Sequence, residues 1–171
     1  DWGPDGRLWV VEMSDYPLGV DGKGKPGGRV RILQDSNGDG RYDRSSLFAD
    51  GLNFPTDLMV WRNGVLVTAA PHVWYLEDTD GDGTADLREP WFTGFVEGNQ
   101  QHRVNGLRWG LDNWVYLANG DSGGQIESVK ASKTVNIQGR DVRIQPDSGR
   151  IEATTGQTQH GRCRDSWGNW W

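Results

Sequence analysis

One arrangement of turns and strands recurs along this chain at intervals of about 50 residues. Each copy opens with a turn that contains Gly or Asn and continues into a short apolar run. The turn residues are Gly6, Gly64, Asn113 and Gly168, which lie 58, 49 and 55 positions apart. A repeat of this length that is built from strands is typical of propellers, solenoids and similar arrays.

Each copy contains two kinds of predicted strand. Continuously apolar runs, as expected for strands buried on both faces, occupy residues 8–11, 65–67 and 114–117. Runs that alternate wholly or in part, as expected for strands with one wet face, occupy residues 28–33, 72–76 and 141–145. The two kinds alternate along the chain, so buried strands are expected to have half-exposed neighbours.

We therefore predict an all-β fold, a partial β-propeller of about three four-stranded antiparallel blades that is a fragment of a larger ring. Residues 1–171 are expected to form one propeller domain. Its blade repeats are predicted at residues 1–52, 53–95, 96–156 and 157–171, with the last one incomplete. An immunoglobulin-like sandwich is the alternative all-β fold, but the repeat favours the propeller.

Only residues 125–133 are free enough of Gly and Pro to form a short helix, within a predicted loop insertion. The chain begins inside a turn, has no initiator Met and ends within an apolar run, so we expect it to be a piece of a longer protein.

Composition excludes several classes of partner. The chain carries 24 acidic and 18 basic side chains, and its net charge of −6 argues against nucleic acid. Its apolar runs are far shorter than the ~20 residues that cross a bilayer, so no membrane span is expected in this fragment. The single cysteine, Cys163, excludes an intramolecular disulfide.

Two acidic turns share the pattern D-x-[DN]-x-D-G-x-x-D and begin at Asp35 and Asp78. Oxygen ligands at alternate positions, with Gly at the sharp bend, suit Ca²⁺. Predicted strands and not helices flank both turns, so we predict structural calcium loops on hairpins. The predicted ligands are Asp35, Asn37, Asp39 and Asp43 in the first turn and Asp78, Asp80, Asp82 and Asp86 in the second.

The alternative is that both segments are polar turns whose Asp side chains cap backbone amides. Crowding of like charges in the second turn favours a bound cation. The first turn also contains Arg41 and Arg44, and is predicted to be the weaker site.

A resemblance begins at His102, in the segment H-R-V-N-G-L-R-W-G-L-D-N-W-V-Y-L-A-N-G-D of residues 102–121. This segment resembles the H-x7-G-x-D…Y…G-D segment of soluble quinoprotein glucose and sorbosone dehydrogenases. The whole chain is more similar to the β-propeller of the membrane-bound dehydrogenase domain family. The phrases that match this family are VEMSDYP at 11–17, LEDTDGDG at 76–83, QHRVNG at 101–106, ANGDSGG at 118–124 and RDSWGNW at 164–170.

The resemblance implies a sugar or alcohol dehydrogenase that depends on pyrroloquinoline quinone (PQQ). In the glucose and sorbosone enzymes the leading His, which is His102 here, is the general base that removes the hydroxyl proton while hydride passes to the quinone. We assign Asn105 and Asp121 to the same catalytic site as supporting groups, since a carboxylate stabilises an imidazolium. Gln101 departs from the family pattern, in which Asp precedes the base.

Arginines are the candidates for binding an anionic quinone or substrate, although solvated surface is their commoner place. The candidates are Arg103, Arg162 and Arg164.

The resemblance also implies a small sugar or alcohol substrate, a haem domain elsewhere in the full-length protein, and a periplasmic or extracellular location. Any membrane association is expected through other parts of the full-length protein. The alternative function is a non-catalytic, calcium-stabilised propeller that binds glycans or proteins, with His102 only lining its channel.

Overall fold

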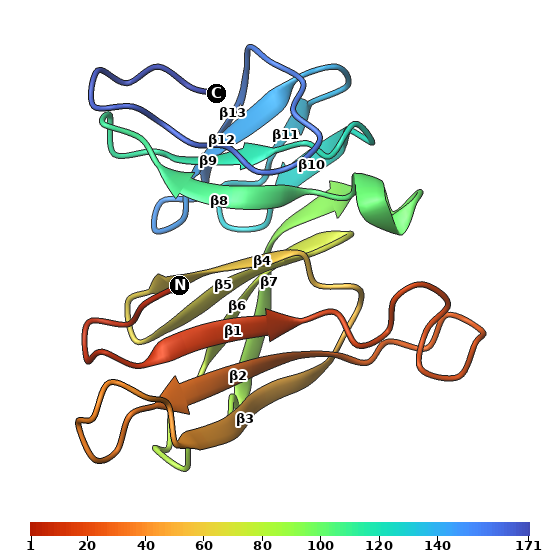
Figure 1. Cartoon of the computed structure of the whole chain (residues 1–171). Coiled ribbons are helices and arrows are strands. Elements are labelled where there is room, and N and C mark those ends of the chain that lie inside the picture. The colour runs from red at the N-terminus through yellow and green to blue at the C-terminus, as the bar shows by residue number, and fades with distance from the viewer. The chain divides into compact units, whose positions relative to one another are not determined.

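The structure is a computed structural model that describes residues 1–171. Thirteen strands and one short 3-10 helix, η1, make up its regular structure (Figure 1). The strands form three antiparallel sheets of three, six and four strands. The predicted all-β class is confirmed. The structure contains no helix with the length and apolar character needed to cross a membrane.

The chain divides into two compact units, which are described separately. The first comprises residues 1–67 and 75–89, and the second comprises residues 68–74 and 90–171.

The first unit contains the three-stranded sheet, in the order β1 (Leu8–Glu12), β2 (Gly28–Gln34) and β3 (Arg44–Leu52). β2 alternates between buried and more exposed residues, as predicted for a strand with one wet face. β1 differs from the prediction of complete burial, because only Trp9 in it is buried. Trp9 packs edge-on against Phe48 of β3, with ring centroids 4.7 Å apart, and this contact anchors β1 to the sheet.

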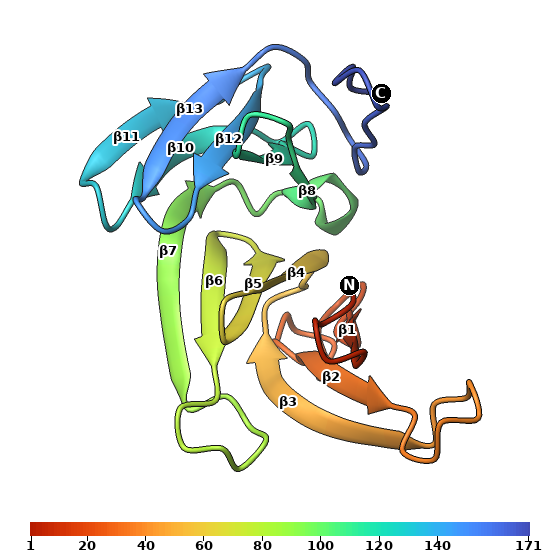
Figure 2. The same cartoon turned by 90° about the vertical axis from the view of Figure 1, so that its left-hand side faces the viewer.

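The six-stranded sheet has the order β11-β10-β7-β6-β5-β4. Its strands are β4 (Asp57–Trp61), β5 (Gly64–Ala69), β6 (His72–Glu77), β7 (Leu87–Phe95), β10 (Gly124–Ser128) and β11 (Lys133–Asn136). Every residue of β5 is buried, which confirms the interpretation of the apolar run at residues 65–67. In Figure 2, the acidic turn that joins β6 to β7 extends beyond the ends of these two strands.

Residues 125–133, the one segment whose composition would allow a short helix, do not form one. These residues belong to the β10–β11 hairpin, in which Ile126 lies opposite Val135. β10 also pairs with β7, and Ile126 is completely buried. The Gln, Glu and Lys side chains of this segment favour helix locally, but burial of Ile126 and pairing with β7 outweigh a helix propensity of only tenths of a kcal/mol per residue.

The four-stranded sheet belongs to the second unit and has the order β13-β12-β9-β8. Its strands are β8 (Asn105–Trp109), β9 (Val115–Ala118), β12 (Asp141–Gln145) and β13 (Arg150–Thr154), and η1 (Gln100–His102) precedes β8. Leu107, Leu117 and Ile144 are completely buried and form part of its core. After β13 the chain forms one isolated bridge, between Arg164 and Trp170.

The predicted turn residues have two different roles. Gly6, Asn113 and Gly168 have positive φ values of 79°, 61° and 90°, which Gly and Asn tolerate best. In the remaining copy the positive φ falls on Arg62, at 56°. Gly64 serves close packing instead, because a Cβ there would lie 2.1 Å from the carbonyl oxygen of Leu76.

Candidate functional site

His102 is the last residue of η1, in the connection into β8. Asn99 caps this short helix: its side chain accepts a hydrogen bond from the Gln101 N–H, and its carbonyl accepts one from the His102 N–H. The cap fixes the turn that presents the imidazole. About a third of the His102 side chain is exposed, so a small molecule can reach it.

Asp121 follows β9 and lies beside His102. β8 and β9 are antiparallel, with Asn105 opposite Ala118, so the connection into β8 and the connection out of β9 lie at the same end of the hairpin. The carboxylate of Asp121 is 3.7 Å from Nδ1 of His102. The structure thus brings together two of the three residues predicted for the catalytic site.

Asn119 and Gly120 position Asp121. The side-chain oxygen of Asn119 accepts the Asp121 N–H at 2.6 Å, while its Nδ2 donates to the carbonyl of Arg140 at 2.7 Å. Gly120 has a φ of 71°, and a Cβ there would lie 2.2 Å from the carbonyl oxygen of Arg103. Only Gly therefore permits this approach of the two connections that carry His102 and Asp121.

Gln159, which lies after β13, is a member of this site that sequence reasoning missed. Its side-chain nitrogen is 3.2 Å from Nε2 and 3.5 Å from Nδ1 of His102. The two residues are 57 positions apart, and no local pattern marks Gln159. Both the carboxylate of Asp121 and the amide of Gln159 therefore lie near the imidazole.

Asn105 acts through the backbone around the site. Its Nδ2 donates to the carbonyls of Arg103 and Gln159, both at 2.8 Å, and its Oδ1 accepts the Gly161 N–H. The side chain thereby ties the connection into β8 to the segment that carries Gln159. Since its amide is engaged with backbone groups, Asn105 is a supporting residue that positions others.

A buried ion pair, which the sequence did not indicate, holds the same segment. Asp141 is fully buried and only 7% of the Arg162 side chain is exposed; Nη1 of Arg162 lies 3.2 Å from Oδ2 of Asp141. These two atoms form an ion pair, but the angles between them do not fit a hydrogen bond. Asp141 also accepts the N–H groups of Asn119 and Thr158 and the Thr158 hydroxyl.

The three candidate arginines are engaged within the protein. Nε of Arg103 donates to the carbonyl of Glu97 at 2.7 Å, and Arg103 is buried. Besides its ion pair, Arg162 stacks over Trp170 at 4.9 Å. Arg164 donates to the carbonyls of Trp109 and Asp165. The side chains of Arg103 and Arg162 are therefore buried by contacts within the protein, and Arg164 binds backbone carbonyls with two of its three nitrogens.

The other two histidines have different surroundings. His160 is exposed. His72 packs edge-on against Trp74, with ring centroids 4.7 Å apart. Burial lowers the pKa of His72, and the negative charge of Glu97 opposes this shift in part. His72 is therefore a neutral packing residue near pH 7.

The second acidic turn brings three of its four predicted ligands together. One carboxylate oxygen each from Asp78, Asp80 and Asp86 lies within 4.8 Å of the others. Asp78 also accepts the N–H groups of Gly81 and Gly83. The Gly83 N–H chiefly lowers the pKa of Asp78, and the Thr79 hydroxyl chiefly lowers the pKa of Asp86. Both groups therefore stay ionised at neutral pH, as a cation ligand must.

Asp82, the fourth predicted ligand of that turn, accepts the Thr84 N–H and is not part of the group.

The first acidic turn shows the same capping without such a group. Asp35 accepts the N–H groups of Gly38 and Gly40. Asp43 accepts the N–H and hydroxyl of Ser36, and the hydroxyl chiefly lowers the pKa of Asp43. The remaining predicted ligands, Asn37 and Asp39, contact each other at 3.4 Å. Amide capping thus occurs in both turns, and a cluster of acidic oxygens forms only in the second.

Residues 1–171 match a protein family described as Domain of unknown function (DUF7133). The chain belongs to the DUF7133 family. No curated protein matches this DUF7133 sequence.

Proposed function

We propose that this chain is the β-propeller portion of a sugar or alcohol dehydrogenase, with His102 as the general base. The observation that carries the proposal is the 3.7 Å separation between Nδ1 of His102 and the carboxylate of Asp121. The resemblance to quinoprotein dehydrogenases supplies the reaction class. The substrate would be a small sugar or alcohol, and the location periplasmic or extracellular.

The geometry suits removal of a hydroxyl proton. A neutral imidazole becomes positively charged when it takes a proton, and a carboxylate at this distance stabilises the charged form. About two-thirds of each of the two side chains is shielded from solvent, which strengthens that interaction relative to open water. The Gln159 amide, 3.2 Å from Nε2, holds the ring orientation until a substrate hydroxyl takes its place.

Oxidation of an alcohol also requires an acceptor for the hydride, and the resemblance names PQQ. When bound, a quinone of this kind supplies two-electron acceptance. Because Arg103, Arg162 and Arg164 all bind other groups of the protein, we assign this chain only the proton-accepting part of the reaction.

The propeller arrangement is likewise part of the proposal. Strands β1 to β3 are consecutive neighbours in one sheet, and β4 to β7 are consecutive neighbours in the next. The four-stranded sheet of β8, β9, β12 and β13 is interrupted in sequence by the β10–β11 hairpin. Consecutive antiparallel neighbours, as in β1 to β3 and in β4 to β7, are what blades require. Ca²⁺ bound by Asp78, Asp80 and Asp86 would stabilise the β6–β7 turn.

The test is quinone-dependent dye reduction by the full-length protein, reconstituted with PQQ and offered a panel of polyols and sugars. We expect activity in the wild-type protein and a loss of at least about 100-fold in His102→Ala, because general-base catalysis contributes factors of this size. His160→Ala removes an exposed histidine from the same unit and should retain activity.

Circular dichroism would show that both variants are folded. Failure of the wild-type protein to oxidise any substrate would contradict the dehydrogenase proposal. It would favour the alternative of a non-catalytic, calcium-stabilised propeller that binds glycans or proteins. Equal activity of His102→Ala and the wild-type protein would remove His102 from the mechanism.

A further inference from the structure

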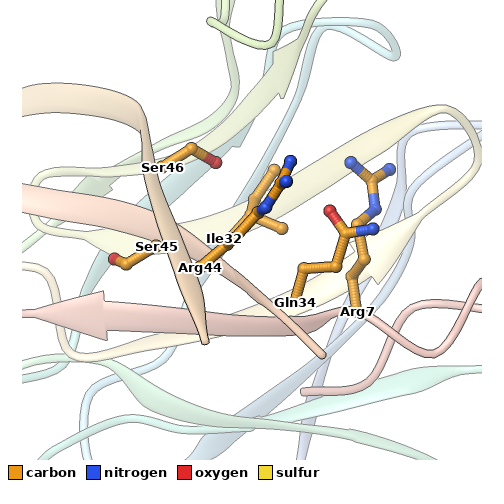
Figure 3. A pocket seen from close by; sticks show the side chains of 6 residues that line it. All are labelled: Arg7, Ile32, Gln34, Arg44, Ser45 and Ser46. Atoms are coloured by element: carbon orange, nitrogen blue, oxygen red, sulfur yellow. The ribbon is translucent and has the colours of Figure 1, made fainter. Parts of the chain in front are cut away.

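A cavity of about 430 Å³ lies on the three-stranded sheet of the first unit (Figure 3). Its lining residues are Arg7, Ile32, Gln34, Arg44, Ser45 and Ser46. They include two guanidinium groups and no carboxylate, although the chain as a whole has a net charge of −6. The cavity is therefore lined by hydrogen-bond donors and by two cationic side chains, of which Arg7 also pairs with the Asp5 carboxylate.

The strand register explains why the two arginines occur together. Gln34 of β2 lies opposite Arg44 of β3, and Leu8 of β1 lies opposite Leu33. Arg7 directly precedes Leu8, outside β1, and lines the same cavity. Since β2 lies between β1 and β3, the two arginines lie on either side of Gln34, with backbones on the order of 10 Å apart.

The next row on the same face contributes the floor and a hydroxyl. Ile32 is buried and lies opposite Ser46, two residues from the row of Gln34 and Arg44. Ser45 lies opposite Leu33, so its side chain belongs to the other face of the sheet. Figure 3 agrees, since the Ser45 hydroxyl points away from Arg44.

Both guanidinium groups retain capacity for a ligand. Arg7 uses Nε to bind Asp5, which leaves its two terminal nitrogens, and the guanidinium lies 5.9 Å from the ring of Trp9. Arg44 is exposed and forms no ion pair within 4.0 Å. The carboxylate of its neighbour Asp43 is occupied by Ser36.

We propose that this cavity binds the phosphate or sulfate group of a small organic molecule. The terminal nitrogens of two arginines can pair with the oxygens of one tetrahedral anion, and the Gln34 amide and Ser46 hydroxyl can donate to it as well. The cavity is larger than one such anion, and pockets of a few hundred Å³ suit small organic molecules. The organic part would lie against Ile32.

None of these residues belongs to the His102 site, and the inference is independent of the proposed dehydrogenase function.

The test is isothermal titration calorimetry of the full chain with inorganic phosphate, inorganic sulfate and phenyl phosphate. Ionic strength is held constant with NaCl to keep general screening unchanged. We expect saturable one-site binding, with phenyl phosphate tighter than inorganic phosphate. The comparison of phosphate with sulfate identifies which oxyanion the cavity prefers.

Matched variants locate the site. Arg44→Gln should weaken binding of phenyl phosphate by about tenfold or more, as expected for the loss of a charge-assisted hydrogen bond. Arg41→Gln removes the same charge from a residue outside the lining and should change the affinity less than about twofold. Ser46→Ala should weaken binding, whereas Ser45→Ala should not.

Three results would overturn the proposal. The first is no saturable binding of any of the three probes. The second is an equal loss of affinity in Arg41→Gln and Arg44→Gln, which would mean attraction to overall charge. The third is equal affinity for phenyl phosphate and inorganic phosphate, which would exclude an organic part on Ile32. Circular dichroism and thermal melting of each variant establish that its fold is intact.

Discussion

Asp141 and Glu152 each pair with an arginine, but they differ in burial. Asp141 is fully buried against Arg162, whereas 36% of the Glu152 side chain is exposed beside Arg143. Removing one partner of a buried pair leaves an uncompensated charge and typically costs 3–5 kcal/mol. We therefore expect Asp141→Asn to lower the free energy of unfolding by about 3 kcal/mol, measured by urea denaturation.

Glu152→Gln is the matched control, since it also removes a carboxylate from an arginine. Its contact is short, with Nη2 of Arg143 at 2.6 Å, but solvent screens the pair. We expect a loss of at most about 1 kcal/mol. Equal losses in the two variants would show that burial of the Asp141–Arg162 pair has no energetic importance.

At the scale of the element, the β6–β7 turn is where a metal would act. We expect Ca²⁺ to raise the melting temperature of the chain by several degrees at concentrations about 100-fold above the dissociation constant. Asp80→Asn should reduce this increase, because Ca²⁺ affinity falls when a ligand charge is lost. The variant keeps a side-chain oxygen that can accept the Asp82 N–H and removes one ligand charge, so the turn itself should persist.

The β2–β3 turn provides the comparison within the same unit. Asp39→Asn removes a charge there, where no group of three acidic oxygens forms, and should leave the calcium effect intact. If Ca²⁺ changes neither the melting temperature nor the heat signal in calorimetry, both turns are amide-capped hairpins only.

On the scale of the whole molecule, large apolar side chains remain exposed. Leu18, Leu111 and Trp167 are 64%, 65% and 86% exposed, and Trp2 and Trp171 are also largely exposed. The sheets also end in edge strands, such as β11. Exposed apolar groups and open strand edges favour association. We expect the isolated chain to self-associate, with an apparent mass in sedimentation velocity that rises with protein concentration.

A chain that sediments as a monomer at all concentrations and melts in one sharp transition would contradict this expectation.

Several features followed from the sequence alone because they depend on local patterns. The apolar run of β5 and the alternation of β2 reflect which faces of a strand are covered, and side-chain periodicity records this directly. The sequence also suggested that Asp121 supports His102, and in the structure the two lie together at the same end of one hairpin.

Only the tertiary structure decided the rest, because the partners come from distant segments. Gln159 reaches His102 from 57 positions away, and Arg162 meets Asp141 from the segment beyond β13. Likewise, β10 pairs with β7, and this overrode the local helix preference of residues 125–133. The periodicity of apolar side chains indicates which face of a strand is buried. The contacts of Gln159, Arg162 and β10 depend instead on which segments become neighbours in the fold, and no local sequence pattern specifies those neighbours.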